Sequence, residues 1–357
     1  MGQSDNGIVK KTALSGMLPE EIDAVCNLPQ RFHSIQIFQW IAQGCSSFEG
    51  MTNLPLKVRE RLTDEYTPCD TVCETVLKDP DGTVKLGIGL HDGSSIETVL
   101  LFDKVSRRTA CVSCQVGCPM GCTFCQTGQL GCLRNLSPNE IVEQFLHLEK
   151  ICGKLDNIVF MGMGEPLLNL DSIAKTIAVL THPKGRNLSH RRITLSTSGI
   201  CKGIYELADS KLDIRLAVSL TTADEDLRTT LMPVTKANPL SELKKAIRYF
   251  NDKTDKRVTL ELALLKDVNT SYKAAQQVRA FAEGLNVHIN LIPWNPVQQL
   301  PYNTPSDSEI RSFYNYLTAE NLNVTVRQKR GRTIGGACGQ LGKKGRTEPK
   351  YSGTKQI

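Results

Sequence analysis

Hydrophobic and polar residues alternate along the chain with two different periods, and each period predicts a different kind of element. Up to about residue 65, apolar residues recur every three or four positions, as at Phe32, Ile35 and Phe38, which predicts short amphipathic helices. Between residues 70 and 101 the period falls to about two, and turn sequences separate three apolar segments. We therefore expect a helical accessory domain over residues 1–68, followed by an antiparallel β-meander that links it to the rest over residues 69–104.

Farther along the chain, predicted strands and helices alternate. The apolar segments that we interpret as strands are Ala110–Val116, Asn157–Met161, Arg192–Ser196, Ile214–Leu220, Val258–Leu265, Val287–Ile292 and Val324–Arg327. Helices are expected between them, and Ser137-Pro-Asn-Glu140 has the sequence of a capping box at a helix start. Repeated β/α units imply a parallel sheet covered by helices, and six or seven units favour a partly closed barrel over a doubly wound sheet. The predicted fold class is α/β, with a partial parallel (β/α)6-type barrel over residues 105–341.

Three cysteines, Cys118, Cys122 and Cys125, are spaced C-x3-C-x2-C on a segment rich in glycine and proline. Thiolates this close on an irregular loop can converge on one metal centre. A four-iron cluster normally takes four thiolates, so three would leave one iron free to bind the amino and carboxylate groups of a ligand such as S-adenosylmethionine (SAM). A zinc site is an alternative, because Cys114 or Cys132 could supply its fourth ligand. Unrelated buried thiols are another.

Small polar and acidic residues follow the predicted barrel strands at the points where the strands end. These residues are Gly164, Glu165, Ser196, Ser219 and Asn295, with Cys338 beyond the last strand. In a parallel β/α barrel, the carboxyl ends of the strands and the loops after them form the functional face. Taken singly, the glycine could form a turn and the serines could cap helices. Their joint position on successive strands favours one polar cup that faces the cysteine loop.

The thirteen cysteines and the charge distribution add two constraints. Many cysteines in a chain whose first residues lack the apolar core of an export signal indicate metal and redox chemistry in a reducing cytoplasm. The net charge of +6 is concentrated at one end, because residues 327–357 carry nine Lys and Arg against one Glu. A nucleic acid is the partner that this basic end favours, and a solvated, disordered tail over residues 342–357 is the alternative. No apolar run is long enough to span a membrane.

Six sequence blocks, in this order, resemble those of one enzyme family. They are Cys111-Val-Ser-Cys-Gln-Val-Gly-Cys118, Phe160-Met-Gly-Met-Gly-Glu-Pro166, Leu195-Ser-Thr-Ser-Gly199, Leu231-Met-Pro-Val234, Ile292-Pro-Trp-Asn-Pro296 and Ala337-Cys-Gly-Gln-Leu341. With the cysteine spacing, they make the chain similar to the radical SAM superfamily, and within it to the RNA adenine methyltransferases of the RlmN/Cfr family. The resemblance extends from the N-terminal helices to about residue 341.

The resemblance implies a role for each candidate residue, one 4Fe–4S cluster and two SAM molecules per turnover. Cys118, Cys122 and Cys125 would bind the cluster. The residues expected to contact SAM are Gly164, Glu165, Ser196, Ser219, Leu220, Thr221 and Asn295. Cys338 would carry the methyl group, Cys111 would resolve the intermediate through a transient disulfide with Cys338, and Glu97 would accept a proton. An external electron donor and a disulfide reductant are implied as well.

The implied reaction is methylation of C2 of an adenine in 23S rRNA near the peptidyl-transferase centre, with tRNA as a second candidate substrate. Two alternatives are methylation of C8 of the same adenine, the type associated with antibiotic resistance, and a non-enzymatic iron–sulfur protein that binds RNA or senses redox state. The target base would have to be unstacked and held by basic residues. Candidates for phosphate contacts are Arg107, Arg108, Arg134, Arg191, Arg192 and the basic C-terminal end. We expect a cytoplasmic monomer without membrane contact.

The chain departs from the family pattern at two places. Thr221 stands where the family usually has His. Residues 333–338 read Thr-Ile-Gly-Gly-Ala-Cys, where the family has Asp-Ile-Asp-Ala-Ala-Cys. Without those two carboxylates, we expect the segment before Cys338 to be more flexible and more basic.

Overall fold

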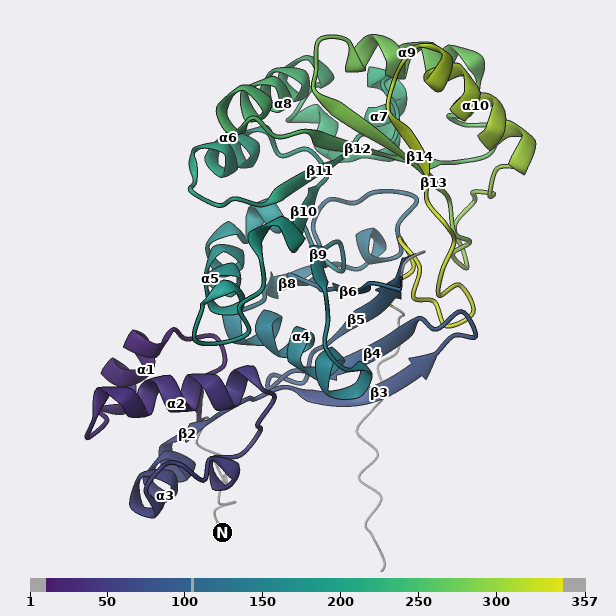
Figure 1. Ribbon diagram of the computed structural model, residues 1–357. Helices are drawn as coiled ribbons and strands as arrows, with labels where there is room; N and C mark the ends of the chain where they lie inside the picture. Colours follow the sequence, from purple (N-terminus) through teal and green to yellow (C-terminus); the bar gives the residue numbers. More distant parts are fainter. Residues whose placement is uncertain (1–10, 104–105, 343–357) are drawn as a thin grey trace, which may run out of the picture.

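A mixed sheet of ten strands forms the centre of the computed structural model, which describes residues 11–103 and 106–342. In order across the sheet the strands are β14 (Val324–Val326), β13 (Val287–Pro293), β12 (Val258–Leu264), β11 (Arg215–Ser219), β10 (Ile193–Thr197), β9 (Asn157–Phe160), β6 (Arg108–Cys111), β5 (Ser95–Phe102), β4 (Val84–Gly89) and β3 (Val72–Lys78). All pairs from β14 to β6 are parallel, and those from β6 to β3 are antiparallel. Because this order has two separate ends in the described part of the chain, the barrel is open (Figure 1).

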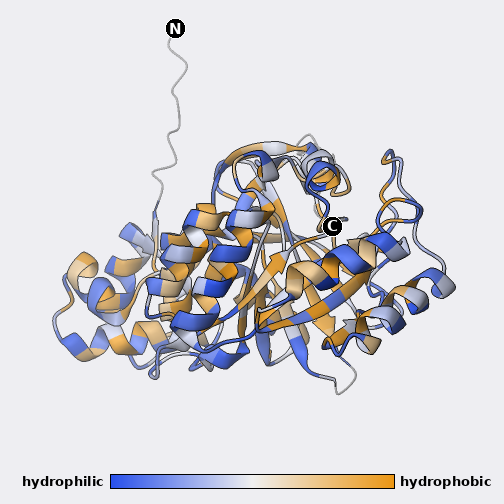
Figure 2. Cartoon of the chain, turned by 90° about the horizontal axis from the view of Figure 1, so that it is seen from above, coloured by the Kyte–Doolittle hydropathy of each residue, from blue (hydrophilic) through white to orange (hydrophobic). Residues whose placement is uncertain are grey.

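Helices connect the parallel strands and lie on the outside of the curved sheet (Figure 1). They are α4 (Pro138–Cys152), α5 (Leu170–Thr181), α6 (Cys201–Asp209), α7 (Glu225–Leu231), α8 (Leu240–Thr254), α9 (Tyr272–Ala282) and α10 (Asp307–Ala319). Their buried positions have helical spacing, as with Leu243, Ile247 and Phe250 on α8. Figure 2 shows mostly hydrophobic strands in the centre and helices with hydrophobic and hydrophilic stripes around them. The predicted α/β fold with a partial parallel barrel is confirmed.

Three further helices lie near the N-terminus, where the apolar spacing predicts them: α1 (Pro19–Cys26), α2 (Arg31–Ala42) and α3 (Leu56–Glu65). Their apolar residues Ile22, Ile37 and Leu62 are fully buried in the same hydrophobic core as the barrel. Two short strands, β1 (Thr12–Ala13) and β2 (Tyr66–Thr67), pair in parallel at the edge of this region. The meander β3–β5 continues the barrel sheet without a break, because β5 pairs with β6.

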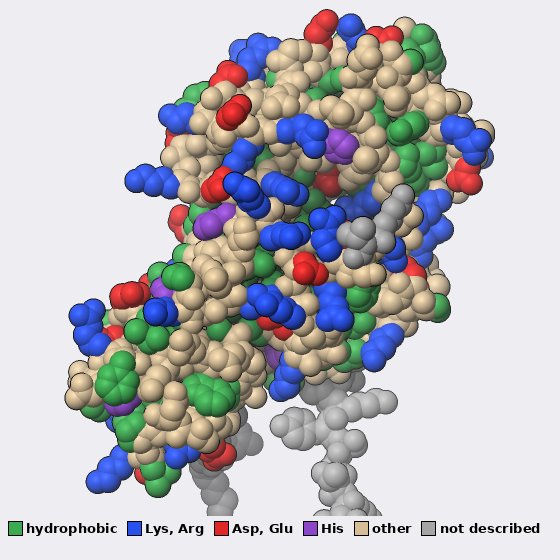
Figure 3. All heavy atoms as spheres, in the orientation of Figure 1, with side chains coloured by type: hydrophobic (Ala, Val, Ile, Leu, Met, Phe, Trp, Pro, Cys, Tyr) green, Lys and Arg blue, Asp and Glu red, His purple; other side chains and the backbone are tan. Residues whose placement is uncertain are grey.

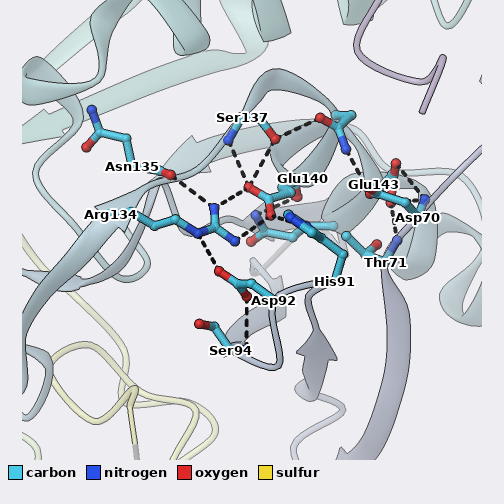
Figure 4. Close-up of polar contacts among 12 residues, drawn as sticks. Asp70, Thr71, His91, Asp92, Ser94, Arg134, Asn135, Ser137, Glu140 and Glu143 are labelled. Carbon is cyan, nitrogen blue, oxygen red and sulfur yellow. Dashed lines mark hydrogen bonds and ion pairs between the residues drawn. The ribbon is translucent and has the colours of Figure 1, made fainter. Parts of the chain in front are cut away.

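A buried carboxylate fastens the N-terminal region to the barrel. Glu143 on α4 accepts a hydrogen bond from the N–H of Thr71 (2.7 Å), as Figure 4 shows. It also accepts a hydrogen bond from the hydroxyl of Ser15. Burial raises the pKa of Glu143 to about 6, although these donors favour the ionised form. The predicted basic tail lies outside the described residues from residue 343 onward. Neither described range contains a helix of the length and apolar character needed to cross a membrane.

One predicted strand, Ala110–Val116, is wrong. The chain leaves the sheet after β6, where the backbone of Ser113 bonds the side chain of Gln144 instead of the backbone of a neighbouring strand. The Ser113 N–H donates to Gln144 Oε1 (2.8 Å), and its carbonyl accepts from Nε2 (3.0 Å). A second segment, β7 (Gln115–Cys118), then pairs antiparallel with β8 (Gly131–Asn135). The cysteine loop is therefore the connection of a separate hairpin, not a direct extension of the first barrel strand.

Arg134 ties this hairpin to the rest of the fold (Figure 4). Its guanidinium forms a bidentate pair with Glu140 on α4, with two bonds of 2.8 Å, and its Nε donates to Asp92 after β4 (2.7 Å). Glu140 also accepts from the N–H of Ser137 (2.9 Å), as the predicted capping box requires. Burial alone would raise the pKa of Glu140, but Arg134 lowers it. The geometry thus favours a structural bridge over the RNA contact that we expected for Arg134.

Replacing Arg134 with Met should lower the free energy of unfolding by about 3 kcal/mol, because the Glu140 carboxylate would stay buried without its partner. Urea unfolding followed by circular dichroism measures the change. Arg107→Met is the matched control, since the Arg107–Asp103 pair is exposed and its loss should cost less than about 1 kcal/mol. Equal losses in the two variants would contradict the structural role of Arg134.

Candidate active site

A cavity opens at the carboxyl ends of the barrel strands, which is the functional face of a parallel β/α barrel. Most of the predicted site residues line it, namely Cys118, Cys122, Cys125, Gly164, Glu165, Ser196, Ser219, Thr221, Asn295 and Cys338. They come from the cysteine loop, from the loops after β9, β11 and β13, from β10 and β11 themselves, and from the segment after β14. Three predicted residues, Glu97, Cys111 and Leu220, do not line the cavity.

The three loop cysteines share one wall of this cavity. Burial raises the pKa of each thiol, to about 12 for Cys118, and a neighbouring loop cysteine adds to the shift for Cys118 and Cys122. In the described ranges, no three His, Cys, Asp or Glu side chains are grouped to hold a single metal ion. The thiolates of a four-iron cluster bind different iron atoms and lie farther apart than the ligands of one ion. Cys114 and Cys132 do not line the cavity.

Hydrogen bonds from two distant segments hold the cysteine loop in place. The N–H of Gln126 donates to the carbonyl of Gly339, next to Cys338 (2.8 Å). The indole N–H of Trp294, in the loop after β13, donates to the carbonyl of Phe124 (2.9 Å). The C-terminal segment and the loop after β13 thus hold the cysteine loop in place. These contacts bring the thiols of the cysteine loop toward Cys338.

Glu165 presents a buried carboxylate at the end of β9. Its Oε2 accepts from both the N–H and the hydroxyl of Ser198 at 2.7 Å, and burial raises its pKa. The preceding Gly164 has a φ of +109°, and a Cβ there would lie 2.8 Å from Cys114 Sγ, so glycine allows this close turn. A cationic ligand group would offset the burial of the carboxylate, which fits the amino group of SAM.

Asn295 offers an unpaired acceptor at the cavity wall. Its Nδ2 donates to the carbonyl of Cys338 (3.3 Å), while its buried Oδ1 has no hydrogen-bond partner among the described residues. Leaving a buried acceptor unsatisfied costs about 1–3 kcal/mol. The atom therefore fits an N–H donor of a bound ligand, and SAM has such donors.

Two charged residues of the cavity were not predicted from the sequence. Glu261 on β12 accepts a hydrogen bond from the Ser196 hydroxyl (2.9 Å), and Arg327 lies 3.8 Å from Glu261. The sequence contains one sign that Glu261 has a special role, namely its position inside the apolar strand segment Leu260-Glu261-Leu262. A charge buried in such a strand is unfavourable without a partner. This pair of opposite charges lies in the cavity wall, next to the Ser196 hydroxyl.

The two thiols outside the cysteine loop are close enough to influence each other. Cys338 lines the cavity, and Cys111 is buried at the end of β6. Burial, followed by the charge of Cys338, raises the pKa of Cys111 to about 12. The charge of Cys338 also raises the pKa of Arg327. The structure thus brings together the two thiols to which the family resemblance assigns the roles of methyl carrier and resolving thiol, and those roles stay predictions.

Sequence and fold match known proteins along most of the chain. Residues 112–275 match the model of the radical SAM superfamily, and residues 27–67 match that of the ribosomal RNA large subunit methyltransferase N-terminal domain. The probable dual-specificity RNA methyltransferase RlmN of Treponema denticola is 64% identical over 332 residues, covering 93% of this chain and 96% of that protein. Its counterpart in Treponema pallidum (strain Nichols) is 59% identical over 331 residues, or 93% and 97% of the two chains. A crystal structure of a radical SAM methyltransferase from Sphaerobacter thermophilus has 38% identity and a TM-score of 0.88, covering 92% of this chain and 99% of that one.

The chain belongs to the RlmN family of radical SAM RNA methyltransferases. As a radical SAM protein, this RlmN-family enzyme uses a 4Fe–4S cluster and SAM, and the predicted cofactors are confirmed. The comparisons support an enzyme and give no support to a non-enzymatic iron–sulfur protein.

Leu220 and Thr221, two predicted SAM contacts of the RlmN-family chain, differ in their position relative to the cavity. The side chain of Leu220 packs in the hydrophobic core, so only its backbone could reach a ligand. Thr221 lines the cavity with a φ of +59°, which is strained for a β-branched residue. Its N–H donates to the carbonyl of Glu261 (3.1 Å), and its carbonyl accepts from Asn269 Nδ2 (2.8 Å). These two bonds hold the strained turn at the position where the family usually has His.

Glu97 contacts the C-terminal segment of the RlmN-family enzyme instead of the cavity. Its Oε1 lies 2.7 Å from Lys85 Nζ, and its Oε2 accepts from the N–H of Gly342 (2.7 Å). Lys85 also donates to the carbonyl of Gly335 (3.3 Å). Lys85 and Glu97 therefore hold the C-terminal segment by hydrogen bonds on both sides of Cys338.

The turn between β3 and β4 anchors the same segment farther upstream. The N–H of Gly331 donates to Asp81 Oδ2 (2.8 Å), and the N–H and hydroxyl of Thr333 donate to Asp79 Oδ2 (3.1 and 2.6 Å). The two carboxylates that the family usually carries within this segment are absent, but the facing turn supplies two others. We expected the segment before Cys338 to be more flexible and more basic, and these three hydrogen bonds hold it from outside.

Asp79→Ala should speed amide hydrogen exchange of residues 331–342 about fivefold, because it removes the acceptor of both hydrogen bonds that Thr333 donates. Hydrogen-exchange mass spectrometry measures the change. The Thr333 hydroxyl holds the pKa of Asp79 below its usual range, so acidification through that lowered pKa should also release the segment. Asp171→Ala, at an exposed position of α5, is the matched control and should leave the exchange unchanged. No difference between the two variants would contradict the anchoring.

Proposed function

We propose that this enzyme methylates C2 of an adenine in 23S rRNA near the peptidyl-transferase centre, and an adenine of tRNA, with Cys338 as the methyl carrier. The observation that carries the proposal is that Cys338 and the three loop cysteines line the same cavity. The relatives named above are probable dual-specificity RNA methyltransferases, which supports two classes of RNA substrate. The domain boundaries, a cytoplasmic location and a monomer are part of the same proposal.

The cavity residues divide into two groups by what they would hold. The cluster ligands would be Cys118, Cys122 and Cys125, with one iron left for SAM. Once bound, the cluster supplies the electron that cleaves SAM into a radical able to take a hydrogen atom. Glu165 would accept from the SAM amino group, and Asn295 Oδ1 would accept a further N–H. Gly164, Ser196, Ser219 and Thr221 would complete this surface. Leu220 does not line the cavity, so a SAM contact there would have to be made through its backbone.

A carrier thiol would allow methylation of a ring carbon that does not react with SAM directly. C2 of adenine lies between two ring nitrogens and is electron-poor, so it does not attack the SAM methyl group directly. Cys338, as a thiolate, would take the methyl group from one SAM and release S-adenosylhomocysteine. The radical derived from a second SAM would remove a hydrogen atom from that methyl group. The methyl carbon, now a radical, would then bond to C2. RNA is then covalently linked to the protein through the Cys338 sulfur.

Two further side chains would complete the reaction. Restoring the ring requires the loss of one electron, for which a bound cluster would supply the acceptor, and of the C2 proton, for which Glu97 would be the acceptor. Glu97 would have to exchange its bond to Gly342 to reach that proton. Cys111, as a thiolate, then attacks the Cys338 sulfur, and the electron pair of the broken carbon–sulfur bond takes up a proton to form the product methyl group. An external reductant reopens the Cys111–Cys338 disulfide.

Substitution of the two thiols separates their roles. Purified enzyme is incubated with SAM, a reductant and a 23S rRNA fragment that contains the peptidyl-transferase centre. Cys338→Ala should yield neither methylated RNA nor a protein–RNA adduct, because there is no carrier. Cys111→Ala should accumulate RNA attached through Cys338, because resolution fails. A denaturing gel with labelled RNA detects the adduct, and nucleoside mass spectrometry identifies the product.

Cys152→Ala, which changes a thiol away from the cavity, should behave like the wild type. An adduct with Cys338→Ala, or none with Cys111→Ala, would overturn the assignment of roles. 8-Methyladenosine in place of 2-methyladenosine from the wild type would overturn the proposed position. A tRNA transcript tested in parallel decides the second substrate.

A basic groove leads from the cavity toward the outside and is suited to the RNA backbone. Lys329 and Arg330 line a small pocket that shares Cys338 with the cavity, and they also line a wider groove between α10 and β14. Arg311 on α10 lies in the same groove, where Asp307 is the acidic residue of the lining. Figure 3 shows Lys and Arg side chains gathered over the middle of one face of the molecule. An unstacked adenine in the cavity would leave its flanking phosphates near this groove.

The double substitution Lys329→Ala/Arg330→Ala should weaken RNA binding and reduce the slope of log Kd against log salt concentration by about 1.4, if each side chain contacts one phosphate of a single strand. Fluorescence anisotropy with a labelled RNA at several salt concentrations measures this slope. Lys245→Ala/Lys253→Ala, on the exposed surface of α8, removes the same charge elsewhere and should leave the slope unchanged. An equal change in both double variants would mean that only net charge matters.

A further inference from the structure

Arg228, on α7, has the largest fully buried side chain in the described part of the protein. Its guanidinium reaches the ends of two barrel strands. Nη2 donates to the carbonyls of Ser198 (2.7 Å) and Ser219 (3.1 Å), and Nε donates to the carbonyl of Leu220 (3.1 Å). Nη1 donates to the Thr235 hydroxyl (2.7 Å). One side chain therefore fixes the backbone just where β10 and β11 reach the cavity.

The charge of Arg228 is not matched by a carboxylate in direct contact. Each hydrogen bond that it donates within the described residues goes to a neutral carbonyl or hydroxyl oxygen. The carboxylate of Glu225, on the same helix, accepts instead from the N–H of Leu240 (3.0 Å). Helix α7 contacts the cysteine loop directly, because the N–H of Thr123, next to Cys122, donates to the carbonyl of Leu231 at the end of α7 (3.0 Å). Burial lowers the pKa of Arg228 to about 10, and the charge of Cys122 opposes this shift. A buried cation is strongly unfavourable unless an anion approaches it, so the site is built to receive negative charge near Cys122.

We propose that Arg228 is a positioning residue of this enzyme, which fixes the two strand ends that face SAM and balances the charge of the cluster bound at Cys122, making that cluster easier to reduce. This proposal rests on the proposed function, because it takes Cys122 as a cluster ligand. A cluster held by thiolates gains one further negative charge when it accepts an electron. A fixed cation in a buried site stabilises that charge more strongly than one in water would.

The two parts of this role depend on different properties of the side chain. Positioning depends on the planar fork of donors, which reaches four oxygen atoms at once and which Lys cannot reproduce. The effect on reduction depends only on the positive charge, which Lys keeps. If Arg228 only filled space, its replacement by Lys would not weaken SAM binding while leaving the reduction of the cluster unchanged.

Arg228→Met and Arg228→Lys separate the two parts. In the reconstituted enzyme without RNA, a redox titration followed by electron paramagnetic resonance gives the midpoint potential of the cluster, and equilibrium dialysis gives the Kd for SAM. Arg228→Met should move the potential to a more negative value and weaken SAM binding about tenfold. Arg228→Lys should weaken SAM binding but keep the potential near that of the wild type. Arg279→Met, which removes a surface charge on α9, is the control and should change neither.

Each outcome decides the proposal. An unchanged potential in Arg228→Met, or an equal shift in Arg228→Lys, would overturn the electrostatic part, and unchanged SAM affinity in both would overturn the positioning part. Arg228→Gln, which keeps an amide donor, is the second neutral variant if Arg228→Met does not fold. Failure of both to fold would replace the proposal with a purely structural role. A wild-type enzyme that binds no cluster would instead contradict the proposed function, so the two failures are distinguishable.

Discussion

The hydrogen bonds between the cysteine loop and the C-terminal segment are the constraint on which the candidate site depends. The Gln126 N–H donates to Gly339 (2.8 Å), and the Thr127 hydroxyl donates to Leu341 (2.7 Å). The barrel strands form the walls of the cavity, but they do not bring Cys338 to the loop thiols. These two bonds do so, and each satisfies a backbone group that would otherwise be buried without a partner. The loop and the segment are therefore positioned as one unit, although they lie at opposite ends of the barrel sequence.

Much of the fold could be predicted from the sequence because most barrel strands contain closely spaced, buried apolar residues. Buried parallel strands give continuous apolar runs, and those of β9 to β14 were located within a few residues. The hairpin β7–β8 was not predicted, since its strands are short and the first seemed continuous with β6. The break occurs because Gln144, from another element, takes the hydrogen bonds of Ser113. A side chain that replaces a strand in this way leaves no periodic signal in the segment it bonds.

The site was predicted where residues follow strand ends and was missed where the determining contact is made inside the barrel. The position of Glu165 and Asn295 follows from the rule that strand ends share one face, together with the family resemblance. Arg228 and Glu261 lie in segments that resemble an ordinary helix and an ordinary strand, and their importance appears only from their burial. Glu97 was predicted as a site residue, but its link to Gly342 was not, because that contact joins residues 245 positions apart. Whether Glu97 accepts a proton stays a prediction.

The attachment of the Cys338 segment to the β3–β4 turn has a consequence for how the enzyme matures. The bond between Asp81 and Gly331 closes a loop of 250 residues, so its entropic cost is met only after the intervening barrel has folded. During synthesis the N-terminal helices and the meander emerge first, and Cys338 emerges among the last residues of the barrel. A nascent chain still on the ribosome would therefore have the cysteine loop and most of the sheet before Cys338 is in place. Placement of Cys338 beside the cysteine loop would be the final event of folding, so an unfinished chain would lack the arrangement of thiols that the proposed methyl transfer needs.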